Sequence, residues 1–267
     1  MALLADKRLF LLDMDGTLYL DEHLFDKVPE FLALIRRRGG RYLFLTNNSS
    51  RGSADYIAKM RRLGIETVPE DYLTSADAAQ HTLLTEFAGQ KCYVSGTASL
   101  CKQLAQAGID VTDTLSDDIT VLLSGFDTEL TFQKLEDSCI LLNRGITWLA
   151  TNPDWVCPTR YGFVPDCGSV CQMLTRATGR SPRFLGKPQP EMVRLALART
   201  GFAPRQAVVV GDRLYTDVAC GVNAGVDSIF VLSGEGSVDD IAEYHIKPTW
   251  IYRDIALLYH ELKENAI

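Results

Sequence analysis

The stretch LFLLDMDGTLY, residues 9–19, decides the fold of this chain. Four apolar residues run directly into Asp13, and Asp15 and Gly16 follow. An apolar run this short, closed by a turn signal, predicts a fully buried strand. Two carboxylates at the end of a buried strand are costly, because desolvation opposes both charges and the charges repel each other. The stretch therefore predicts a site in which other groups compensate this negative charge.

Other short apolar runs also end in polar residues at a turn: RYLFLTNNSS (41–50) with Thr46 and Asn47, RFLGKPQP (183–190) with Lys187, QAVVVGDR (206–213) with Asp212, and DSIFVLSGEG (227–236) with Ser233. Helical periodicity, closed by glycine, separates them at 28–40, 53–64 and 191–201. This alternation predicts an α/β fold with a Rossmann-like parallel sheet core and helices on both faces. Ligands bind such sheets at the carboxyl ends of the strands, so we expect these polar residues to share one site.

The middle of the chain predicts a second α/β domain. Further strands are expected at KCYVSG (91–96), ITVLLSGF (119–126) and ITWLATN (146–152), and none ends in a comparable acidic pair. We therefore expect a core formed by 1–76 and 180–267, with 77–179 inserted as a large α/β domain.

Composition narrows the function classes. The chain has 267 residues, 46% of them hydrophobic, and a formal net charge of −7 with a pI near 5.2. An acidic protein of this kind is not expected to bind nucleic acid or an anionic membrane. Its seven cysteines are odd in number and lack C-x-x-C spacing, which is typical of reduced thiols in a cytoplasmic protein. We expect neither a signal peptide nor an apolar run of about 20 residues that could span a membrane.

The two carboxylates of the opening stretch suit phosphoryl chemistry. Asp13 can act as a nucleophile and Asp15 as a general acid and base. A carboxylate that attacks phosphorus forms an acyl phosphate, which water then cleaves. The pattern predicts a small-molecule phosphate ester as substrate.

An anionic substrate at a cluster of carboxylates requires positive charge. A magnesium ion can bridge Asp13 and the phosphoryl oxygens, and GDRLYTD supplies Asp212 and Asp217 as further oxygen donors. Lys187 can neutralise the remaining phosphoryl charge. Two further donors to the same oxygens are the Thr46 hydroxyl and the Asn47 backbone N–H.

These motifs, in this order, resemble those of the haloacid dehalogenase superfamily of phosphatases. The matching segments are DMDGTL (13–18), LTNNS (45–49), GKP (186–188) and GDRLYTD (211–217). With TNPD (151–154) and GKPQPEM (186–192), the long insert is similar to that of the NagD-like subfamily, whose p-nitrophenyl phosphatase-like members carry a large α/β cap of type IIA.

The resemblance implies a role for each matching position. Asp13 is expected to be the nucleophile and Asp15 the acid and base, with Mg²⁺ bound by the Asp13 carboxylate, the Asp15 backbone carbonyl and Asp212. Asp217 is expected to lie behind these ligands or to orient Lys187, which would hold the phosphoryl group with Thr46 and Asn47. The implied substrates are p-nitrophenyl phosphate, nucleoside monophosphates, and sugar or glycolate phosphates. Whether the protein forms a homodimer through the cap is left open by the sequence.

Two other functions use similar residues. A phosphotransferase or phosphomutase would share the four motifs, usually with a smaller helical cap. A regulatory protein that carries an aspartyl phosphate without turnover would need no acid such as Asp15.

Two features of the insert have open roles. The Asn152–Asp154–Trp155 loop either contacts the leaving group or forms a tight turn against which Trp155 packs. Asp166 stands where relatives often have glycine, so cap closure or specificity could differ here.

Overall fold

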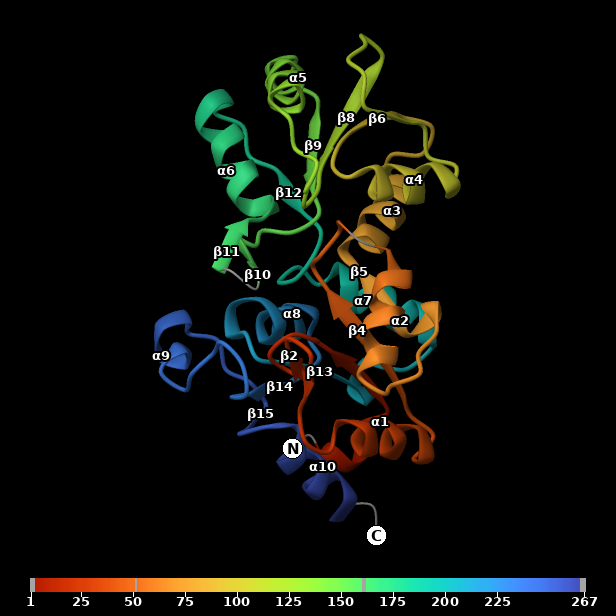
Figure 1. Ribbon diagram of the computed structural model, residues 1–267, viewed down its shortest axis with the longest axis vertical. Helices are drawn as coiled ribbons and strands as arrows, with labels where there is room; N and C mark the ends of the chain where they lie inside the picture. Colours follow the sequence, from red (N-terminus) through yellow and green to blue (C-terminus); the bar gives the residue numbers. More distant parts are fainter. Residues whose placement is uncertain (1–2, 51, 160–161, 265–267) are drawn as a thin grey trace. The chain divides into compact units, whose positions relative to one another are not determined.

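The structure is a computed structural model that describes residues 3–50, 52–159 and 162–264. Contacts within the chain group it into two compact units (Figure 1). The first comprises Met1–Thr46, Ser53–Leu73 and Lys187–Ile267, and the second comprises Asn47–Gly52 and Thr74–Gly186. Beyond the predicted insert 77–179, the second unit thus also contains 47–52, 74–76 and 180–186.

A six-stranded sheet forms the centre of the first unit, in the order β15-β14-β13-β1-β4-β5. Its strands are β1 (Leu9–Leu12), β4 (Arg41–Thr46), β5 (Tyr72–Thr74), β13 (Ala207–Gly211), β14 (Asp227–Val231) and β15 (Trp250–Tyr252). The pairs β1–β4, β1–β13, β13–β14 and β14–β15 are all parallel. Strand β1 is buried along its whole length, which explains its uninterrupted apolar run.

Helices cover both faces of this sheet, as predicted. They are α1 (Val28–Arg37), α2 (Ser53–Arg62), α7 (Glu191–Thr200), α8 (Ala219–Ala224), α9 (Asp240–Tyr244) and α10 (Ile255–Glu264). On one face, Phe10 of β1 packs in one core with Phe31 of α1 and Leu258 of α10. On the other face, α8 contacts β13 and β14. A short hairpin of β2 (Tyr19–Leu20) and β3 (His23–Leu24) follows β1.

Shorter helical turns connect several elements of the first unit. The 3₁₀ turns are Leu4–Asp6, Pro69–Asp71 and Pro204–Gln206, and a π-helical turn spans Leu214–Val218.

The second unit contains a five-stranded sheet in the order β12-β9-β8-β6-β7. The strands are β6 (Lys91–Ser95), β7 (Val111–Thr112), β8 (Ile119–Ser124), β9 (Thr147–Ala150) and β12 (Arg183–Phe184), and all their pairings are parallel. The unit's helices are α3 (Ser75–Glu86), α4 (Ala98–Gln106), α5 (Phe132–Asn143) and α6 (Cys167–Thr178). A hairpin of β10 (Val156–Thr159) and β11 (Gly162–Pro165) precedes α6. The prediction of a second α/β domain is thus confirmed in its architecture.

One predicted strand lies in the other sheet. We expect 183–190 to contribute a strand to the first sheet, and this is wrong, because β12 pairs in parallel with β9 of the second unit. The pairing continues past the strand, since Leu185 N–H donates to the Ala150 carbonyl at 3.0 Å and Gly186 N–H to the Thr151 carbonyl at 2.7 Å. The chain returns to the first unit only at Lys187.

Among the described residues, no helix is both long and apolar enough to cross a membrane.

Candidate active site

The side chain of Lys187 lies between two carboxylates of the first unit. Its ammonium lies 2.6 Å from Asp13 Oδ1 and 2.7 Å from Asp217 Oδ1, and it donates to the Leu45 carbonyl at 3.2 Å. Only 3% of Lys187 is exposed. Burial disfavours its charge, but the Asp13 and Asp217 carboxylates outweigh burial and raise the pKa of Lys187. The lysine is therefore held as a cation between two carboxylates.

The neighbouring strands β1, β4 and β13 explain this meeting. Asp13 directly follows β1, Leu45 lies in β4, and Asp217 lies in the π-helical turn after β13. Since the strands are parallel and adjacent, their carboxyl ends lie at one edge of the sheet. The structure brings Asp13, Lys187, Asp212 and Asp217 close together at this edge.

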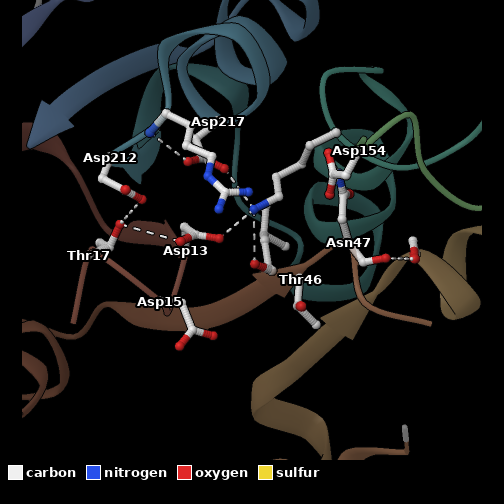
Figure 2. Close-up of polar contacts among 12 residues, drawn as sticks. Asp13, Asp15, Thr17, Thr46, Asn47, Asp154, Asp212 and Asp217 are labelled. Atoms are coloured by element: carbon white, nitrogen blue, oxygen red, sulfur yellow. Dashed lines mark hydrogen bonds and ion pairs between the residues drawn. The ribbon is translucent and has the colours of Figure 1, made fainter. Parts of the chain in front are cut away.

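Asp212 follows β13 and is fixed through both carboxylate oxygens. Oδ1 accepts from the Thr17 hydroxyl at 3.2 Å (Figure 2). Oδ2 accepts from Glu235 N–H at 2.8 Å. Gly16 and Gly234 make room for this carboxylate, because a methyl group at either position would overlap Asp212 Oδ2. Burial and the nearby Asp217 charge raise the pKa of Asp212 to about 6.

Three carboxylates form a candidate metal site. Oxygens of Asp13, Asp212 and Asp217 lie within 4.8 Å of one another. Burial and the Asp217 charge raise the pKa of Asp13 well above its usual range, and Lys187 only partly opposes this. Buried carboxylate oxygens that repel one another are a donor set suited to a hard divalent cation such as Mg²⁺. The residues present thus fit the ion that the sequence predicts.

Asp15 stands apart from this cluster. Figure 2 shows its carboxylate pointing away from Asp13. Its oxygens contact Lys59 of α2, at 3.3 Å, and the Tyr19 hydroxyl, also at 3.3 Å. Neither of these two partners follows from the sequence pattern, because neither belongs to a recognised motif.

Thr46 is the last residue of β4 and is almost fully buried. Its hydroxyl lies 3.4 Å from the hydroxyl of Tyr56 in α2. The residue belongs to the first unit, whereas Asn47, the next residue of the chain, belongs to the second.

Within the second unit, Asn47 is held through its side chain and its carbonyl. The amide nitrogen donates to both oxygens of Asp154, at 3.2 and 3.1 Å (Figure 2). The carbonyl accepts from the Ser75 hydroxyl at 2.6 Å and from the Asn152 amide at 2.7 Å. These contacts bind segment 47–52 to the second unit.

The Asn152–Trp155 loop is a turn rather than a set of exposed contacts. Asn152 is fully buried, and its Oδ1 accepts from Asp154 N–H at 3.1 Å, as in an Asx turn. The Asn152 amide is engaged inside the unit, where it donates to the Asn47 carbonyl, which favours the alternative of a tight turn. Trp155, which follows the turn, is 58% exposed.

Asp166 has a local structural role. It is the N-cap of α6, and its carboxylate accepts from Cys167 N–H at 2.5 Å.

Arg213 and Glu235 are further members of the first unit's site. Arg213 Nε lies 2.8 Å from Glu235 Oε2, and Arg213 N–H donates to Asp217 Oδ2 at 3.1 Å. Although burial opposes its charge, the Asp13 and Glu235 carboxylates raise the pKa of Arg213. Arg213 could have been found from the sequence, because it lies inside the GDRLYTD motif. Glu235 could not, because it lies in the loop after β14 and belongs to no motif.

A buried lysine between two carboxylates, with a third carboxylate close by at the carboxyl edge of a parallel sheet, is an arrangement suited to phosphoryl transfer. A haloacid dehalogenase-like hydrolase family model matches residues 10–110, and an HAD-hydrolase-like model matches 184–258. The chain belongs to the haloacid dehalogenase-like hydrolases.

Individual relatives cover nearly the whole chain. An acid sugar phosphatase of Staphylococcus haemolyticus is 30% identical over 96% of this chain and 97% of its own length. The structure of a 4-nitrophenylphosphatase from Thermotoga maritima matches with a TM-score of 0.90 and 36% identity, over 97% of this chain and 98% of that one. A glycerol phosphate phosphatase from Mycobacterium tuberculosis, solved with magnesium, matches with a TM-score of 0.89 and 33% identity, over 97% of this chain and 78% of that one.

Proposed function

We propose that this protein is a Mg²⁺-dependent phosphoric monoester hydrolase that acts on small phosphate esters through a phosphoryl group on Asp13. The carrying observation is that the Lys187 ammonium lies between the carboxylates of Asp13 and Asp217, beside Asp212. Relatives that span the chain are phosphatases named for sugar phosphates, nitrophenyl phosphate and glycerol phosphate, which supports this substrate class.

In the first step, an Asp13 carboxylate oxygen attacks phosphorus. A bond forms between this oxygen and phosphorus, and the bond from phosphorus to the ester oxygen breaks. The departing ester oxygen takes a proton from Asp15. Lys187, the Thr46 hydroxyl and the Asn47 backbone N–H hold the phosphoryl oxygens and offset their charge.

In the second step, water attacks the phosphorus of the acyl phosphate. Asp15, now ionised, takes a proton from that water, and the bond between phosphorus and Asp13 breaks. Inorganic phosphate leaves and Asp13 is restored. Asp217 keeps Lys187 in place during both steps, because its other oxygen is fixed by Arg213 N–H.

The residues that would hold Mg²⁺ are the Asp13 and Asp212 carboxylates and the Asp15 backbone carbonyl. When bound, the ion supplies positive charge to the phosphoryl oxygens and to the buried carboxylates. Thr17 and the N–H of Glu235 orient Asp212 for this role.

We also propose that the second unit, with boundaries near 77 and 179, is a cap, and that the protein is cytoplasmic and dimerises through the cap. In the part of the chain that the structure describes, no disulfide joins any two cysteines, which supports a reducing compartment. Exposed apolar side chains on and beside the β10–β11 hairpin support a cap interface: Trp155, Val156 and Phe163. The net charge of −7 argues against a nucleic-acid partner.

A panel assay tests the function. The purified protein is incubated with p-nitrophenyl phosphate and with sugar, glycerol and nucleoside monophosphates, with Mg²⁺ or with a chelator. We expect inorganic phosphate in the Mg²⁺ samples only. A phosphorylated acceptor in place of free phosphate would show a phosphotransferase, and a stable phosphoprotein without release would show a regulatory module.

A further inference from the structure

Asp15 is held by two residues that no motif contains. One carboxylate oxygen lies 3.3 Å from the Lys59 ammonium, and the other accepts from the Tyr19 hydroxyl at 3.3 Å. Both oxygens of the side chain are thus engaged, although the side chain is 57% exposed.

Tyr19 is a rigid support for this carboxylate. The tyrosine is fully buried, and its backbone carbonyl accepts from Gly16 N–H at 2.8 Å. An isolated β-bridge joins residue 19 to Asp15 itself. The same residue therefore fixes both the main chain and the side chain around Asp15.

Lys59 is fixed by the same tyrosine. Its ammonium lies 3.9 Å from the centre of the Tyr19 ring, and its side chain is only 24% exposed. An exposed ion pair alone restrains its partners weakly, because both side chains lose conformational freedom when they meet. A cation that also rests on an aromatic face has less freedom to lose. The three residues form one unit, defined here as the Asp15 clamp: Asp15, Tyr19 and Lys59.

We propose that Lys59 and Tyr19 are positioning residues that hold the Asp15 carboxylate apart from Asp13, where it exchanges protons with the leaving group and with water. The oxygens of the leaving group and of water both lie opposite the Asp13 oxygen across phosphorus in an in-line displacement, so an acid and base is needed on that side. This inference rests on the proposed function, because it assigns to Asp15 the proton transfers of that mechanism. Its consequence depends on the leaving group. An alkoxide is a strong base and needs a proton as it departs, whereas p-nitrophenolate is a weak base and departs without one.

The test compares two substrates, glycerol phosphate and p-nitrophenyl phosphate, with Mg²⁺. Lys59→Met and Tyr19→Phe are each expected to lower kcat for glycerol phosphate by about tenfold more than kcat for p-nitrophenyl phosphate. Lys59→Arg restores most of the loss, since it keeps the cation over the ring. The matched control is Arg62→Met, which removes a cation of the same helix that pairs with Glu22 instead, and its substrate ratio is expected to equal that of the wild type.

A double-mutant comparison separates positioning from a general structural effect. In an Asp15→Asn background, Lys59→Met is expected to change the substrate ratio less than twofold, because there is no carboxylate left to position. Equal losses on both substrates, or an unchanged loss in the Asp15→Asn background, would overturn the inference. Absence of phosphate release from either substrate by the wild type would instead refute the proposed function. If Lys59→Met does not fold, the same comparison of the two substrates is made with Tyr19→Phe, which retains the buried ring.

Discussion

The Lys187 ammonium lies 2.6 Å from Asp13 Oδ1, and this contact joins residues that are 174 positions apart in the chain. Asp217 Oδ1 lies 2.7 Å from the same ammonium. The lysine thus offsets the charge of one buried carboxylate, Asp217, and one partly buried carboxylate, Asp13.

Lys187→Met is therefore expected to be both inactive and less stable. Without the ammonium, the buried Asp217 carboxylate and the partly buried Asp13 carboxylate lose this cation, which costs about 3–5 kcal/mol of the free energy of unfolding near neutral pH. We expect kcat/KM to fall by at least about a hundredfold. Denaturant unfolding and phosphate release measure the two effects. Lys91→Met, which removes a surface pair with Asp118, is the control and should change stability by less than about 1 kcal/mol. A stable Lys187→Met protein would contradict the account.

Asp212 predicts a pH dependence of stability in the metal-free protein. The folded pKa of about 6 lies above the unfolded value of about 4, so the folded state binds this proton more tightly. The resulting stabilisation is complete below about pH 4 and is lost as the pH rises through about 6, up to about 3 kcal/mol. The free energy of unfolding is measured with denaturant in the presence of a chelator. When the pH is raised from about 5 to about 7.5, this free energy should fall more for the wild type than for Asp212→Asn. Parallel pH curves for the two proteins would show that Asp212 is not perturbed.

The close packing of Gly234 against the Asp212 carboxylate leads to a prediction about Mg²⁺ binding. Gly234→Ala introduces a methyl group that overlaps Asp212 Oδ2, so the carboxylate must move. We expect the Mg²⁺ concentration for half-maximal activity to rise by about tenfold or more. Gly52→Ala is the control, because a methyl group there meets no atom within 4 Å. An unchanged magnesium requirement in Gly234→Ala would place the ion away from Asp212.

Substitution of Asn152 distinguishes a structural role of this residue from contact with the substrate. Its buried amide donates to the Asn47 carbonyl, so Asn152→Ala is expected to lower the free energy of unfolding by about 1–3 kcal/mol. Asn143→Ala, at an exposed position of the same unit, should stay within about 0.5 kcal/mol of the wild type. Unchanged stability together with substrate-selective losses of kcat/KM would show instead that Asn152 contacts the leaving group.

The sequence was informative where a pattern carries its own physical reason. Buried parallel strands leave apolar runs, and their carboxyl ends share an edge, so Asp13 and Asp212 could be placed together without coordinates. Strand β12 shows where this fails. Two residues of strand, Arg183 and Phe184, carry too little pattern to reveal which sheet they join.

The contacts that orient the site were beyond prediction. Lys59 and Asp15 are 44 positions apart, and α2 reads as an ordinary amphipathic helix whose lysine could face solvent. Glu235 acts on Asp212 through its backbone N–H, which any residue except proline could provide. Such interactions depend on three-dimensional packing and leave no residue-type signature.

The most direct test of the central claim is phosphate release by Asp13→Asn beside the wild type, with Mg²⁺ and a substrate on which the wild type turns over. Circular dichroism verifies that the variant is folded. Because an amide cannot form the acyl phosphate, we expect release to fall by at least about a thousandfold. Undiminished release by a folded Asp13→Asn protein would contradict the assignment of Asp13 as the nucleophile.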